Sequence, residues 1–144
     1  MNKKLKKKFI WNEDYSVGVA SIDEQHQHFF GIVNAILDVT DVADVSYEML
    51  AEPIRELNEY AQYHLGAEEA YFSKFDYPEA AAHINAHDQY REKIRSYLKA
   101  INASTRDARA LAEELAIFSG DWLFGHILLM DRQYTEALRK HMAH

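Results

Sequence analysis

Apolar residues recur at alternating three- and four-residue steps in four stretches of this 144-residue chain. This spacing puts them on one face of an α-helix, so the pattern predicts four amphipathic helices. No stretch alternates between apolar and polar residues with the period of two that is typical of a strand. The helices should begin near residues 21, 46, 78 and 105. Four long helices with short connections predict an all-α fold, an up-down-up-down four-helix bundle.

Residues with known boundary preferences support these limits. Ser21 followed by Glu24 is a capping box, which should open the first helix. Pro53 falls inside the second stretch and should kink that helix or delay its start. The remaining signals are Asp44 or Ser46 as N-cap of the second helix, Tyr77-Pro78 as its stop and the start of the third, and Ser104 or Thr105 as N-cap of the fourth. Residues 9–20 should form an extended N-terminal arm that packs on the bundle.

The apolar faces also predict which residues are buried near the helix ends. Tyr71 and Phe75 continue the apolar stripe of the second helix, and Leu129 continues that of the fourth. Between Trp122 and Met130 the fourth helix is apolar nearly all round, so this part should be deeply buried.

Seven polar side chains replace apolar residues on these faces. They are five histidines and two acidic residues: His26, His64, Glu68, His83, His87, His126 and Asp131. Residues four apart lie one above the other on a helix, so His64 should reach the same point as Glu68. The same holds for His83 and His87. His126 and Asp131 are five apart, about 140° around an α-helix, so they should not stack and should reach different edges of a cluster.

A single buried histidine is more often a hydrogen-bonded core residue than a ligand. Seven such groups, two of them carboxylates, would lose too much hydration without a compensating cation. The sequence therefore predicts a binuclear metal site, and imidazole with bridging carboxylate suits iron, zinc, manganese or copper. No histidine follows a glutamate by three residues, the spacing typical of carboxylate-rich di-iron oxygenases. The absence of cysteine excludes thiolate zinc sites and iron–sulfur clusters.

Composition narrows the partners and the location. A net charge of −7 argues against nucleic acid or an anionic membrane as the main partner. No apolar run approaches the roughly 20 residues that span a bilayer, and no signal-peptide pattern is present, so we expect a soluble cytoplasmic protein. Five lysines lie among the first eight residues. We expect residues 1–8 to be a basic, disordered tail and residues 9–144 to form one domain.

Motifs spread over nearly the whole chain match one known family. They are Trp11…Tyr15-Ser16-Val17-Gly18-Val19, Ile22-Asp23-Glu24-Gln25-His26, His64-x-x-x-Glu68, Tyr77-Pro78, His83-x-x-x-His87 and Trp122-Leu123-x-x-His126-Ile127-x-x-x-Asp131. In these motifs the chain resembles the hemerythrins, and most closely the single-domain bacterial hemerythrins. Each motif alone is weak, whereas the set is highly specific.

The resemblance implies two iron ions, Fe²⁺ or Fe³⁺, joined by a bridging oxo or hydroxo group, with an open position for dioxygen on one of them. The ligands would be His83, His87 and His126 on one iron, His26 and His64 on the other, and Glu68 and Asp131 as bridges. The apolar pocket around dioxygen would be lined by Leu65, Trp122, Leu123 and Ile127. Leu65 stands where the family often has Phe, and Asp76 stands where a Gly often precedes Tyr-Pro.

The function that the resemblance implies is reversible dioxygen binding for carriage, storage or delivery of oxygen, which is not an enzyme activity. Two other functions stay open. One is an oxygen or redox sensor that acts through a partner. The other is a di-iron oxidase or peroxidase, in which Tyr71, Tyr90 or Tyr134 could move protons. The protein that would receive the oxygen is unknown.

Overall fold

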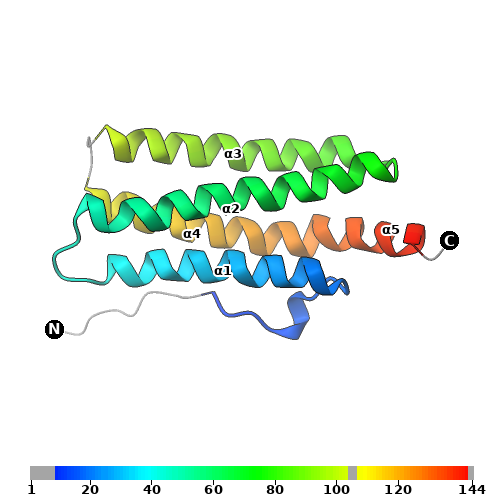
Figure 1. Ribbon diagram of the computed structural model, residues 1–144, viewed down its shortest axis with the longest axis horizontal. Coiled ribbons are helices and arrows are strands. Elements are labelled where there is room, and N and C mark those ends of the chain that lie inside the picture. Colours follow the sequence, from blue (N-terminus) through cyan, green and yellow to red (C-terminus); the bar gives the residue numbers. More distant parts are fainter. Residues whose placement is uncertain (1–8, 104–106, 143–144) are drawn as a thin grey trace.

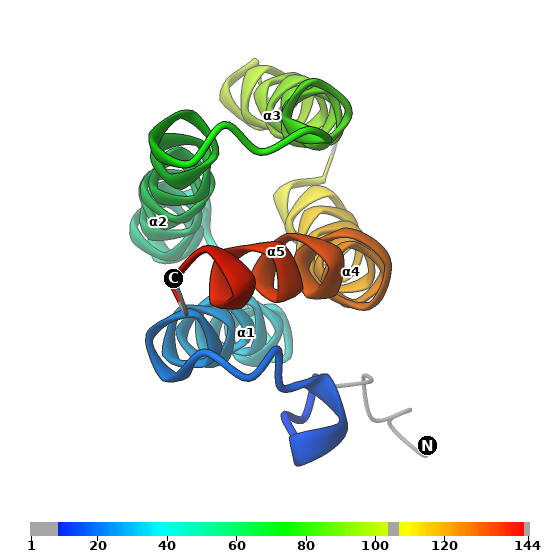
Figure 2. The same cartoon turned by 90° about the vertical axis from the view of Figure 1, so that its right-hand side faces the viewer.

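The computed structural model describes residues 9–103 and 107–142. Its four long helices are α1 (Ala20–Thr40), α2 (Tyr47–Lys74), α3 (Ala80–Asn102) and α4 (Ala108–His126), and no strand occurs in these two ranges. Consecutive helices run in opposite directions (Figure 1), and seen end-on they occupy the four corners of a bundle (Figure 2). The prediction of an all-α, up-down-up-down four-helix bundle is confirmed. The basic segment 1–8 lies outside the described residues.

Two further helical elements follow α4 directly. A π-helical turn, η2 (Ile127–Asp131), follows α4 directly and leads into α5 (Arg132–Met142). The three elements follow one another directly in the chain (Figure 1), and α5 turns away from the axis of α4 across the end of the bundle (Figure 2). Within the described ranges no helix combines the length and apolarity needed to cross a membrane.

The first helix begins differently from the capping-box prediction, which is wrong. Val19 is the N-cap and Ser21 already lies inside α1. Asp23 satisfies the chain ahead of the helix instead: its Oδ1 accepts from the Val17 backbone N–H at 2.9 Å and its Oδ2 from the Ser16 hydroxyl at 2.6 Å. The Asp23 carboxylate thus points back toward the arm, and a residue inside α1 provides the acceptor for the segment that precedes the helix.

The later boundaries agree with the sequence in part. Ser46 caps α2, since its Oγ accepts from the Met49 N–H at 3.3 Å, and α2 continues through Pro53. The third helix begins at Ala80, two residues later than the expected start at Pro78. Ser104 and Thr105 lie outside the described residues, and the N-cap of α4 is Asp107.

The turn after α2 explains why a glycine would suit position 76. Asp76 has φ +51°, in the left-handed region. Next to it, the Tyr77 N–H donates to the Phe72 carbonyl at 3.0 Å, and the two rings pack with centroids 5.3 Å apart. This is a Schellman motif with its hydrophobic contact, and glycine is the usual residue at the left-handed position. The motif holds Phe72 against His83, with ring centroids 4.6 Å apart.

A short 3-10 helix, η1 (Glu13–Tyr15), interrupts the N-terminal arm, which packs on α1 and α4 as expected. The Phe9 N–H donates to Asn34 Oδ1 at 2.9 Å, and Asn34 Nδ2 donates back to the Phe9 carbonyl at 2.8 Å. The Phe9 ring is buried over Gly120, where an added Cβ would stand 2.2 Å from its Cζ. Gly120 is therefore required for this close approach.

The buried faces match the sequence except near two helix ends. Tyr71 is 40% exposed and Phe72 is buried in its place, while Leu129 is 77% exposed. The expectation that the whole stretch from Trp122 to Met130 is deeply buried is therefore wrong. The cause is η2, whose i→i+5 hydrogen bonding re-phases the helix and turns Leu128 and Leu129 outward.

Candidate metal centre

All seven polar side chains predicted on the buried faces converge in one half of the bundle, and each is at most 5% exposed. Their ligand atoms form two groups in which all atoms lie within 4.8 Å of one another. The three-histidine lobe contains Glu68, His83, His87, His126 and Asp131, and the two-histidine lobe contains His26, His64 and Asp131. Asp131 is common to both lobes.

In the three-histidine lobe the imidazoles turn their Nε2 atoms toward one point. His126 Nε2 lies 2.8 Å from His83 Nε2 and 3.1 Å from His87 Nε2. Asp131 Oδ1 is 3.0 Å from the Nε2 atoms of both His83 and His126. Three ring nitrogens and a carboxylate oxygen thus surround a volume that a cation could occupy.

The two-histidine lobe lies next to it. His26 Nε2 is 3.1 Å from Asp131 Oδ2, and His64 Nε2 is 3.2 Å from Glu68 Oε1. The same Glu68 oxygen is 3.6 Å from His87 Nε2, across the boundary between the lobes. Both carboxylates therefore lie between the two groups of histidines, where each could bridge two cations.

The π-helical turn η2 corrects the expectation that His126 and Asp131 do not stack. Widening the turn to i→i+5 brings residues five apart onto the same face, and these two side chains approach to 3.0 Å. An uninterrupted α-helix would have pointed them about 140° apart. Such turns occur frequently at functional sites.

Several buried atoms of the cluster lack a partner in hydrogen-bonding geometry within the part of the chain that the structure describes. They include His26 Nε2, His64 Nε2, both Glu68 oxygens and Asp131 Oδ2. A buried polar atom left unsatisfied is costly, and native structures contain few of them. These atoms face the centre of the cluster, so the residues present fit a pair of cations.

The protonation states suit ligation as well. Burial lowers the pKa of His64 to about 3 and that of His87 to about 2, so both imidazoles are neutral at pH 7. Burial would raise the pKa of Asp131, but the surrounding imidazoles, His126 first, hold it well below its usual range. Burial, reinforced by Asp131, raises the pKa of Glu68 well above normal. Asp131, His64 and His87 are thus ready to bind a cation, which would also displace the proton from Glu68.

Two outer residues that the sequence analysis missed hold the ligand rings. His64 Nδ1 is 2.7 Å from Gln25 Oε1, and His87 Nδ1 is 2.7 Å from Glu69 Oε2. Both oxygens accept the ring N–H, so each ring presents its Nε2 lone pair to the cluster. The need for such acceptors could have been predicted, because a metal-binding histidine nearly always donates its other ring N–H to one. Nothing in the sequence, however, states which distant residue supplies it.

The four apolar residues expected around the ligands are placed unequally. Leu65, Leu123 and Ile127 are fully buried. Trp122 is half-buried and stacks on His126 of the three-histidine lobe, with ring centroids 4.4 Å apart. The rings nearest the other lobe are Phe29, 6.3 Å from His64, and Trp11, 6.5 Å from His26. That the four line a dioxygen pocket stays a prediction.

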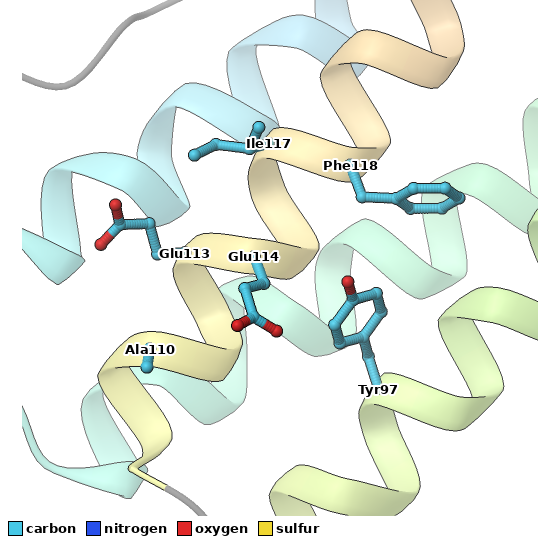
Figure 3. A pocket seen from close by; sticks show the side chains of 6 residues that line it. All are labelled: Tyr97, Ala110, Glu113, Glu114, Ile117 and Phe118. Carbon is cyan, nitrogen blue, oxygen red and sulfur yellow. The ribbon is translucent and has the colours of Figure 1, made fainter.

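Two features lie apart from the centre. His28 is exposed on α1, as expected for a residue two positions from His26. A surface hollow of about 450 Å³ lies between α3 and α4, where Tyr97 faces Glu114 and Phe118 (Figure 3). None of its lining residues belongs to the seven.

Comparison with known proteins identifies the family of the chain. The family model of the hemerythrin HHE cation-binding domain matches residues 17–138. Bacteriohemerythrin of Clostridium acetobutylicum is 29% identical over 131 residues, which cover 89% of this chain and 99% of that protein. Bacteriohemerythrin of Pseudomonas aeruginosa is 27% identical over 134 residues, covering 93% and 84% respectively.

A likeness of fold accompanies the sequence match. A crystal structure of wild-type hemerythrin has a TM-score of 0.79 at 24% identity and covers 88% of this chain and 95% of that chain. The family match extends over most of the sequence and includes all seven clustered residues. The chain belongs to the hemerythrin family of HHE cation-binding domains.

Proposed function

We propose that this protein binds dioxygen reversibly at a di-iron centre and serves in oxygen carriage, storage or delivery. The observation that carries the proposal is the inequality of the two lobes, three histidines against two, around shared carboxylates. His83, His87 and His126 would hold one iron, His26 and His64 the other, and Glu68 and Asp131 both. Having fewer protein ligands, the two-histidine lobe would have room for an external ligand.

Two ferrous ions would supply the two electrons that dioxygen takes up on binding and returns on release. The chain contributes the environment. Five imidazole ligands and only two carboxylates would give the di-iron cluster a low net charge, which would favour the ferrous–ferric cycle over higher oxidation states. The fully buried Leu65, Leu123 and Ile127 would exclude water from the reactants.

The tyrosines near the cluster argue for a binding protein over an oxidase or peroxidase. Burial raises the pKa of Tyr90, whose hydroxyl donates to Ser119 Oγ at 2.8 Å. Burial and the nearby Glu68 also raise the pKa of Tyr134. Both phenols therefore hold their protons tightly. Tyr71 is 40% exposed, whereas Tyr90 and Tyr134 are fully buried. Neither buried tyrosine is a ready proton donor for turnover.

The test is an optical spectrum of the anaerobic, iron-loaded protein before oxygen, after it, and after its removal, with metal counted per chain. We expect two irons and a charge-transfer band that vanishes when oxygen is removed. His26→Ala should lower the iron content, whereas His28→Ala, exposed on the same helix, should not. An irreversible ferric spectrum would contradict the carrier and favour a sensor or an enzyme.

A further inference from the structure

Arg91 and Glu69 form a rigid support behind one ligand of the three-histidine lobe. Arg91 Nη1 donates to Glu69 Oε2 at 2.7 Å, and Arg91 Nη2 donates to Glu69 Oε1 at 3.1 Å. The same Oε2 accepts the Nδ1–H of His87 at 2.7 Å. Two parallel bonds between a guanidinium and a carboxylate fix the carboxylate in position as well as attracting it.

Further contacts hold the arginine itself. Arg91 Nε donates to Gln62 Oε1, and Nη1 donates to Asp88 Oδ1, both at 3.0 Å. Arg91 is only 17% exposed and Glu69 24%, so solvent competes little for these bonds. The support thus ties α2 to α3 directly behind His87.

The two-histidine lobe has a different support. The Nδ1–H of His64 is accepted by the amide oxygen of Gln25, at the same 2.7 Å but without a formal charge. His26 Nδ1 has no hydrogen-bond partner in the described ranges, and neither has His83 Nδ1 of the three-histidine lobe, so the contrast lies between Glu69 behind His87 and Gln25 behind His64. A carboxylate acceptor raises the basicity of a metal-binding imidazole, and charge-assisted bonds are about twice as strong as neutral ones.

We propose that Glu69, fixed by Arg91, is a positioning residue that makes the three-histidine lobe the tighter metal site, which fills first and empties last. The two-histidine lobe, backed by the neutral Gln25, is the weaker site. This inference rests on the metal centre of the proposed function but not on its oxygen chemistry. It assigns an order of loading to two sites that share Asp131.

Reciprocal substitutions test this order. Glu69→Gln keeps an acceptor behind His87 and removes the charge, whereas Gln25→Glu adds a charge behind His64. The measurement is a titration of the metal-free protein with zinc against a competing chelator. The wild type should bind two zinc ions in two steps. Glu69→Gln should weaken the tighter step by about 10- to 100-fold and leave the other unchanged. Gln25→Glu should tighten the weaker step.

Glu59→Gln is the matched control. It makes the same substitution on the same helix, in a glutamate that also pairs with an arginine, Arg55, at 3.1 Å. Glu59 is 64% exposed and contacts no histidine in the described part of the chain, so both zinc steps should keep their affinity. A weakening equal to that of Glu69→Gln would show a general loss of charge and overturn the proposal.

Cobalt(II) provides a second readout, since its visible bands report the ligand field. Glu69→Gln should shift the bands of the first cobalt equivalent and not those of the second. If Glu69→Gln does not fold, Arg91→Gln keeps the carboxylate and should weaken the tighter zinc step by a smaller factor. An unchanged tighter step, or both steps weakened equally, would overturn the proposal.

The outcomes separate this proposal from the proposed function. If neither substitution changes the affinity of either zinc-binding step, the order of loading is overturned and reversible oxygen binding still stands. If zinc binds as expected but the iron-loaded protein does not release oxygen, the order of loading stands and the proposed function is overturned. A wild type that takes up fewer than two zinc ions would overturn the order of loading, and one that takes up fewer than two irons would overturn the proposed function.

Discussion

The half of the bundle that contains Leu50, Leu57 and Leu115 differs from the half that contains the metal centre in what fills its core. In the first half the core is aliphatic, and these three leucines are at most 1% exposed. The second half buries five imidazoles and two carboxylates, each at most 5% exposed. The same four helices pass through both halves (Figure 1).

This difference separates two sources of stability. Burial of apolar surface contributes about 25 cal/mol per Å² whatever else is bound. Buried polar atoms without partners oppose folding until a cation satisfies them. The apolar half should therefore hold the bundle together by itself, while the polar half should depend on its metal ions.

Acid should produce the largest effect, and in the polar half. Burial lowers the pKa of His64 from 6.5 to about 3 and that of His87 to about 2. Below pH 6.5 the unfolded chain takes up protons that the folded protein excludes, so stability falls as pH drops. The free energy of unfolding of the metal-free protein, measured with denaturant, should therefore fall by several kcal/mol between pH 6.5 and 3. Glu68, whose pKa burial raises, opposes part of this loss as pH drops. Bound zinc should delay the fall, and a flat profile would contradict the prediction.

Glu68→Ala should destabilise the metal-loaded protein by about 3–5 kcal/mol, because it removes a partner from a buried charged cluster. Iron content should fall with it. The loss should be much smaller in the metal-free protein, where both Glu68 oxygens lack partners. Thermal unfolding and metal analysis of both forms check this, with Glu59→Ala, at a 64% exposed position, as control. Equal losses in both forms would show that the cluster does not depend on metal.

Leu115→Ala tests the apolar half. The side chain is fully buried in α4, so its loss should cost about 2–5 kcal/mol through lost burial and a cavity. The cost should be the same with and without metal. Ile117, 37% exposed on the same helix, gives a control whose change to Ala should stay within about 0.5 kcal/mol. A cost that depends on metal would mean that the two halves are coupled.

Gly120→Ala should cost about 1 kcal/mol, less than these core changes, because alanine improves the helix while its Cβ displaces the Phe9 ring. Denaturant unfolding measures this change. Combining it with Phe9→Ala should remove the clash, so the pair should be non-additive. If the two changes in the free energy of unfolding simply add, Phe9 does not pack on Gly120.

Asp76→Gly should be the smallest effect and a gain, about 0.5 kcal/mol. The left-handed conformation at φ +51° strains aspartate, and glycine trades that strain for a higher entropy of the unfolded chain. Thermal unfolding of both proteins measures the difference. A loss of stability would show that the aspartate side chain contributes to the turn.

Much of the centre could be predicted because a charged or imidazole group at an apolar helix position is visible in the sequence. Helical spacing placed all seven residues on buried faces, where the structure brings them together, and it predicted the approach of His64 to Glu68, which lie 3.2 Å apart. Spacing failed for His126 and Asp131, since it assumes an α-helix and the chain adopts a π-helical turn. Capping failed at Ser21 for a similar reason: Asp23 turned toward Ser16 and Val17, which a local motif does not include.

The sequence by itself determined that four amphipathic helices would bury a polar cluster, because burial follows from local periodicity. Only the tertiary structure decided how the cluster is divided and supported. Gln25 reaches His64 across 39 residues, and Glu69 reaches His87 across 18. Such contacts depend on how helices pack and rotate against each other, and no local pattern contains that information. The same packing gave one lobe a charged support and the other a neutral one.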